Sequence, residues 1–134
     1  MKMEFTEENL KKLEDVLSKC YGHDTVPTSA KEKVKNNILA GQCVPASLIV
    51  NDSFGGDLKF CKVGEIFHCF NEIEGQIVDL TAGQFEGENP IREKVGTVTR
   101  EWIFETQEDI ANRYSSLKAR VYQQLGIKEI GEEK

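Results

Sequence analysis

The spacing of apolar residues up to residue 56 predicts helices. From Phe5 to Cys20 they recur at the period of an amphipathic helix, and Thr6 is placed to cap its start. Ala30 to Leu39 is a weaker helical stretch. A further helix is expected to begin at Gly41-Gln42-Cys43 and to end at Phe54-Gly55-Gly56. Because this helix is apolar on nearly all sides, we expect it to be buried.

After these glycines the pattern changes to that of strands. Leu58 to Val63 alternates apolar and polar residues, and Ile66 to Phe70 and Gln76 to Leu80 continue as further strands. Turns are expected at Gly64-Glu65 and within Asn71 to Gly75. The three segments therefore predict a short antiparallel meander.

The last part of the chain is expected to close the fold. Val95 to Phe104 is expected to add one or two strands, and Trp102 to join the core. A final helix is predicted from about Gln107 to Leu125, capped by Thr106. The chain is thus predicted to be an α+β fold of N-terminal helices, a buried cysteine-bearing helix packed on an antiparallel sheet, and a C-terminal helix. Its length of 134 residues fits one domain spanning residues 1–134.

The amino-acid composition limits the kinds of partner that the protein is expected to bind. The net charge is −6, and the lysines and arginines are scattered among acidic residues. A phosphate-binding surface needs clustered basic residues, so we expect no nucleic-acid partner. No apolar run approaches the roughly 20 residues that span a bilayer, and no signal-peptide core follows the N-terminus. We therefore expect a cytoplasmic protein without a membrane partner, whose four cysteines are free thiols.

Cys43 stands where a reactive cysteine is expected. It follows a glycine and begins a buried helix. Backbone N–H groups at a helix N-terminus favour a thiolate over a thiol, and they can also stabilise an oxyanion. The alternative is that Cys43 is a small buried hydrophobic residue, which is the commoner fate of a cytosolic cysteine.

His68 and Asp79 are predicted to form a pair across two strands. Aspartate is disfavoured in strands, and a charge at this position needs a partner. If the hairpin turns on Glu74-Gly75, Phe70 faces Asp79, and His68 lies on the same face about 7–8 Å away along the diagonal. If the loop centres on Ile73-Glu74, His68 and Asp79 lie opposite each other. A three-residue loop would separate them.

These residues together predict covalent chemistry. An aspartate that binds one ring nitrogen fixes the histidine tautomer and leaves the other nitrogen free to activate a thiol. We therefore expect Cys43 to act as nucleophile, His68 as base and Asp79 as orienter. The order helix Cys, strand His, next-strand Asp is that of papain-like and transglutaminase-like enzymes.

Three further residues are weaker candidates for an oxyanion or pocket role. Gln42 is expected either to donate to an oxyanion or to cap the helix. Asn71 is read as a pocket residue or a turn former, and Gln84 as a pocket residue or a solvent-facing one. No cofactor is expected. A metal site at Cys43, Cys61, His68 and Cys69 is disfavoured because there is no C-x-x-C pair and adjacent strand residues face opposite ways.

Several short motifs occur in order along the chain: Gly41-Gln42-Cys43, Gly55-Gly56-Asp57, His68-Cys69-Phe70-Asn71, Val78-Asp79-Leu80-Thr81, Gln84-Phe85 and Arg113-Tyr114. Together they resemble the pattern of the YunG-like bacterial proteins. The resemblance covers about Tyr21 to Phe85 and continues in the last helix. Cys69-Phe70 replaces the aromatic pair expected after the histidine, and Val44-Pro45 stands where small residues are expected. The resemblance implies a papain-like fold, as in NlpC/P60-type hydrolases, with Cys43, His68 and Asp79 as its polar positions.

Two functions follow as hypotheses. The first is a cysteine hydrolase or acyltransferase acting on an amide, thioester or isopeptide bond of a small-molecule or peptide substrate. The second is a binding or interaction module that retains the fold without turnover, since fold alone does not give function. The sequence specifies neither the substrate nor the oligomeric state.

Overall fold

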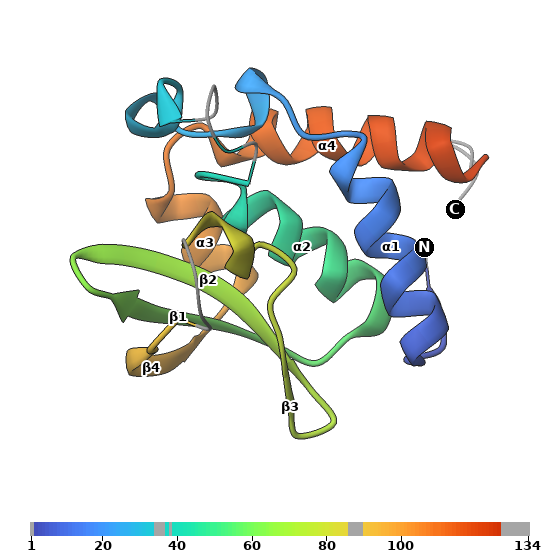
Figure 1. Ribbon diagram of the computed structural model, residues 1–134, viewed down its shortest axis with the longest axis horizontal. Helices are drawn as coiled ribbons and strands as arrows, with labels where there is room; N and C mark the ends of the chain where they lie inside the picture. The colour runs from blue at the N-terminus through green and yellow to red at the C-terminus, as the bar shows by residue number, and fades with distance from the viewer. Residues whose placement is uncertain (1, 34–36, 38, 86–89, 127–134) are drawn as a thin grey trace.

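The structure is a computed structural model that describes residues 2–33, 37, 39–85 and 90–126. Figure 1 shows a layered arrangement in which one central helix lies between a sheet and a long C-terminal helix. The helices are α1 (Glu7–Ser18), α2 (Cys43–Phe54), α3 (Arg100–Thr106) and α4 (Ile110–Leu125). The strands are β1 (Asp57–Val63), β2 (Ile66–Ile73), β3 (Gln76–Val78) and β4 (Glu93–Val98). The chain therefore has an α+β fold.

The central helix α2 is buried because it is covered on two sides. It packs against β2 on one side and α4 on the other (Figure 1). Side chains around its whole circumference are buried, which explains its uniformly apolar sequence: Cys43, Val44, Pro45, Ala46, Ser47, Leu48, Ile49, Val50 and Ser53. Asn71 of β2 donates to the backbone oxygen of Ser47 at 3.0 Å and so joins the strand to this helix. The start of α2 is thereby held beside the sheet.

The described strands form one antiparallel sheet in the order β3-β2-β1-β4. Ile73 pairs with Gln76 across a two-residue turn at Glu74-Gly75, so the first of the expected registers is confirmed. The turn expected within Asn71 to Gly75 is confirmed, and residues up to Ile73 remain paired in β2, which is longer than the predicted strand Ile66 to Phe70. This register carries Asp79, just beyond β3, toward the part of β2 that holds His68.

Other expectations about the first half of the chain are confirmed. Thr6 caps α1 by accepting the N–H of Asn9 at 3.0 Å, and Cys20 is buried. Gly55 ends α2 with a positive φ, as predicted. The helical stretch predicted from Ala30 to Leu39 is not an α-helix in its described residues, and residues 34–36 and 38 lie outside them. Ala30 itself ends a short 3-10 helix, Thr28–Ala30.

The second half differs from the prediction at one junction. The strand β4 ends at Val98, and Thr99 then caps α3 by accepting the N–H of Trp102 at 3.0 Å. The prediction of strand structure as far as Phe104 was therefore wrong. The prediction that Trp102 joins the core was also wrong, since Trp102 is 41% exposed. The last helix begins at Ile110 rather than Gln107, and Thr106 belongs to α3 rather than capping α4. The local helix cap therefore decided the conformation of this segment, because its apolar pattern alone did not distinguish a strand from a helix.

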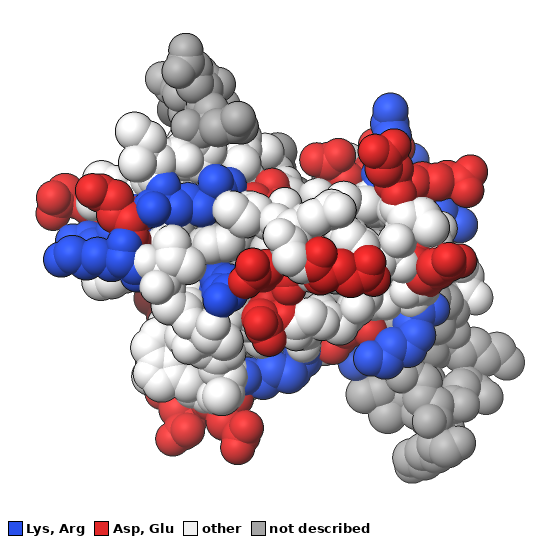
Figure 2. Space-filling model, turned by 90° about the horizontal axis from the view of Figure 1, so that it is seen from below, with Lys and Arg blue, Asp and Glu red and all other residues white. Residues whose placement is uncertain are grey.

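Charged side chains of both signs are mixed on the surface below the sheet. Figure 2 shows that face, with basic and acidic groups interspersed.

Among the described residues, no helix combines the length and apolar character that a membrane span requires. All four cysteines are free and buried.

Candidate active site

A buried histidine and aspartate form the centre of the site. His68, on β2, has no exposed surface, and its Nε2 lies 2.6 Å from Oδ2 of Asp79. The edge of the Phe85 ring lies against the imidazole, with the ring centroids 4.9 Å apart. Burial by itself lowers the pKa of His68, but the hydrogen bonds with Asp79 and Cys43 outweigh it and raise the pKa to about 9. The imidazole is thus bonded to a carboxylate, and the nearby Cys43 side chain also raises its pKa.

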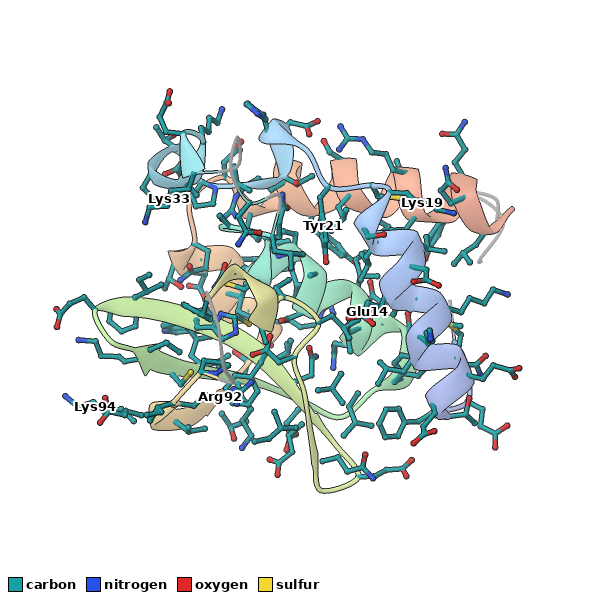
Figure 3. The ribbon with its side chains drawn as sticks, viewed as in Figure 1. Glu14, Lys19, Tyr21, Lys33, Arg92 and Lys94 are labelled. Carbon is teal, nitrogen blue, oxygen red and sulfur yellow. The ribbon has the colours of Figure 1, made fainter. Side chains whose placement is uncertain are left out.

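Asp79 is held in its charged form by more than the histidine. Arg92, which precedes β4, donates from Nη2 to Oδ2 of Asp79 at 2.9 Å, and its guanidinium stacks over the Phe70 ring. Figure 3 shows Arg92 near the ribbon of β2. Burial raises the pKa of Asp79, but the His68 hydrogen bond and Arg92 outweigh it, so the pKa lies below its usual value. The sequence reading missed Arg92, because only the register of β4 brings it beside the meander.

Gln84 lies in the site rather than toward solvent. It ends a short 3-10 helix, Ala82–Gln84, and its Nε2 lies 3.0 Å from Nδ1 of His68. Its Oε1 accepts the backbone N–H of Gly41 at 3.1 Å, which fixes the amide with its NH2 group toward the ring. A neutral His68 can accept this bond at Nδ1 while it donates from Nε2 to Asp79, so Gln84 opposes the protonated ring that Asp79 favours. Gln84 therefore competes with the Cys43 thiol for Nδ1.

Gln42 and Asn71 lie in structural positions. Gln42 is fully buried, its Oε1 accepts the hydroxyl of Thr25 at 2.5 Å, and its Nε2 donates to the backbone oxygen of Gly22 at 3.3 Å. Asn71 is engaged by α2, as described above. Neither residue lines the cavity at Cys43. Their oxyanion and pocket roles stay predictions, which these contacts do not favour.

Cys43 opens onto a cavity of about 350 Å³. Its wall is largely apolar, with Val44, Phe60, Ile66, Phe67 and Phe85 among the lining residues. Arg113 of α4, which is 3% exposed, also lines it. Arg113 lies on the same helical stripe as the buried Ile110, Tyr114 and Leu117. An arginine on an apolar stripe was a signal of function that the sequence reading did not use.

The described residues offer no alternative metal centre. No three His, Cys, Asp or Glu side chains among them gather in a way that could hold a metal ion. Cys61 pairs directly with His68 across β1 and β2, whereas Cys69 lies on the opposite face of β2 from His68. Burial raises the pKa of both Cys61 and Cys69. These two thiols are therefore held in the neutral form.

Comparison with known proteins gives the family. The family model described as YunG protein matches residues 9–126. The chain belongs to the YunG protein family. Within that family, it is 39% identical over 46 residues to the Uncharacterized protein YunG of Bacillus subtilis (strain 168). That alignment covers 34% of this chain and 40% of the relative, so it spans well under half the relative's length. No solved structure matches the chain.

The site makes the stability of this YunG-family chain depend on pH. The pKa of His68 is about 9 in the folded protein and about 6.5 in an unfolded chain, so folding favours the protonated ring. This stabilisation is fully present below pH 6.5 and is lost as the pH rises through 9. We expect the urea midpoint to fall between about pH 6 and pH 8.5. The fall should be smaller in His68→Gln, and an equal fall in both proteins would contradict the assignment.

Proposed function

We propose that this YunG-family chain is a cysteine hydrolase or acyltransferase that acts on an amide, thioester or isopeptide bond. Cys43 is the nucleophile, His68 the base and Asp79 the orienter. The observation that carries the proposal is the fully buried imidazole, which is bonded through Nε2 to a carboxylate and whose pKa is raised by the Cys43 side chain at the N-terminus of α2. The proposed fold is a papain-like arrangement, supported by a cysteine helix packed against an antiparallel sheet that carries the histidine.

The proposed reaction proceeds through an acyl-enzyme. The Cys43 proton passes to Nδ1 of His68, and the sulfur attacks the carbonyl carbon of the substrate. The tetrahedral intermediate collapses, the bond to the leaving amine or thiol breaks, and His68 returns its proton to that group. Water then attacks the thioester carbonyl carbon and gives one proton to His68. The C–S bond breaks, the acid is released, and the Cys43 sulfur takes the proton back from His68. In an acyltransferase, an amine or thiol takes the place of water.

The N-terminus of α2 is the proposed source of oxyanion donors. The first N–H groups of a helix have no partner inside the helix, and Cys43 and Val44 occupy these positions. Pro45 has no N–H to contribute, so the donors are limited to the residues before it.

Alkylation of individual cysteines tests the proposal. We expect iodoacetamide at neutral pH to modify Cys43 at least about tenfold faster than Cys69, because a thiolate rather than a thiol is the nucleophile. His68→Ala should remove most of this advantage. Cys69 is a matched control because it is also buried and lies next to His68 in the sequence. Mass spectrometry of the labelled peptides gives the rate at each cysteine. Equal rates at Cys43 and Cys69 would overturn the proposal.

A binding module without turnover is the second candidate. The observation that favours it is the hydrogen bond from Gln84 to Nδ1 of His68, since that nitrogen is then occupied. In such a module the His68–Asp79 pair would be structural, and His68→Ala would not slow alkylation of Cys43. The experiment above therefore separates the two candidates.

A further inference from the structure

Arg113 is a buried cation with an unused hydrogen-bonding group. Its side chain is 3% exposed, and Nε donates to the backbone oxygen of Glu108 at 2.8 Å. Its Nη1 has no hydrogen-bond partner among the residues that the structure describes. A buried unpartnered donor is costly, and more so when it is charged. Arg113 therefore keeps a hydrogen-bonding group that no described residue uses.

No nearby carboxylate fills this role within the described part of the chain. Glu108 precedes α4, but its carboxylate accepts the backbone N–H of Thr28 at 3.0 Å and the Thr28 hydroxyl at 2.7 Å. Arg113 contacts Glu108 only through the backbone oxygen. The described residues also contain no ion pair to Arg113. Its positive charge is therefore not neutralised by a directly bonded side chain.

The location of Arg113 links this charge to the proposed chemistry. Arg113 and Cys43 line the same cavity, together with apolar side chains and with the charged Lys33 and Glu108. An arginine in such a pocket favours a group that carries negative charge and planar oxygen acceptors. The cavity of about 350 Å³ holds a small molecule or one end of a peptide.

We propose that the Cys43 cavity recognises acyl substrates that carry a carboxylate, and that Arg113 binds this carboxylate while Cys43 attacks the neighbouring carbonyl carbon. The proposal rests on the proposed function, because it uses the same cavity and nucleophile. It adds a substrate class: carboxylate-bearing amides, thioesters or peptide ends. In this proposal, Arg113 determines which acyl substrates the cavity binds.

Two alkylating reagents that differ only in charge test the inference. Iodoacetate carries a carboxylate next to the carbon that reacts, and iodoacetamide carries a neutral amide there. In both cases the Cys43 sulfur displaces iodide. We expect the ratio of iodoacetate to iodoacetamide rates at Cys43 to exceed that of glutathione in the same tube by roughly ten- to a hundredfold. A ratio equal to that of glutathione would overturn the inference.

Variants of Arg113 assign the effect to its side chain. Arg113→Gln should lower the rate ratio to that of glutathione, and Arg113→Lys should retain part of it. Arg120→Gln is the matched control, because Arg120 lies on the same helix but does not line the cavity and pairs with Asp24. Equal loss of both rates in Arg113→Gln would mean that Arg113 only stabilises the thiolate. That result would contradict carboxylate binding.

A binding measurement on the wild-type chain separates the inference from the proposed function. The Nε–H resonance of Arg113 is followed by NMR during titration with N-acetylglycine and with N-acetylglycinamide. A saturable shift with the carboxylate alone supports the inference, even if Cys43 is inert to both reagents and the proposed function fails. No shift with either compound, or an equal shift with both, overturns it. This measurement also holds if the Arg113 variants do not fold.

Discussion

Replacement of Asp79 by asparagine is expected to lower the pKa of His68 from about 9 toward its ordinary value of about 6.5. In the wild type, the charged form of His68 is stabilised by its hydrogen bond to Asp79, in opposition to burial. An asparagine has no negative charge and can present its NH2 group to Nε2. The neutral ring would then carry its proton on Nδ1, the nitrogen that should accept the Cys43 proton.

The measurement is an NMR titration of the imidazole together with the alkylation rate of Cys43. We expect that rate at neutral pH to fall by at least about tenfold, since the base is then in the wrong tautomer. Asp24→Asn is the matched control, because it makes the same chemical change at an exposed carboxylate that pairs with Arg120. A pKa of His68 that stays near 9 in Asp79→Asn would contradict the assignment of Asp79 as orienter.

Gly41→Ala is expected to destabilise the protein by about 2–4 kcal/mol. Gly41 leads directly into α2 with a φ of +78°, and a Cβ there would lie 2.5 Å from Cβ of Ala30. The substitution therefore adds a steric clash to the strain of a left-handed backbone. Because the Gly41 N–H also donates to Gln84, a shift here would move the start of α2 relative to the site.

Gly75→Ala separates the two causes. Gly75 has nearly the same φ, +79°, but nothing lies within 4 Å of a Cβ built there. This control should cost only the backbone strain, about 1–2 kcal/mol. Urea unfolding of the wild type and both variants gives the free energies. If the two variants lose the same free energy of unfolding, the close approach of Gly41 to Ala30 does not add to the cost of the substitution.

Local patterns predicted most of the first half of the fold because local physics sets those elements. Thr6 supplies a side-chain cap for α1, Gly55 adopts the positive φ that ends α2, and the Glu74-Gly75 turn fixes the register of β2 and β3. The segment after Val98 was misjudged, since its apolar residues fit a strand or a short helix equally well. The cap by Thr99 favoured the helix.

The sequence by itself determined the α+β order and the position of Cys43 at the start of a buried helix, and it left three strand registers, two of which let His68 reach Asp79. These features depend on residues close together along the chain, where capping, alternation and turn length act directly. Only the tertiary structure decided that Arg92 pairs with Asp79, that Gln84 binds His68, and that Arg113 lines the cavity at Cys43. These contacts join separate elements. They depend on how β4, the 3-10 helix at Gln84 and α4 pack around α2 and β2, and no local pattern encodes that packing.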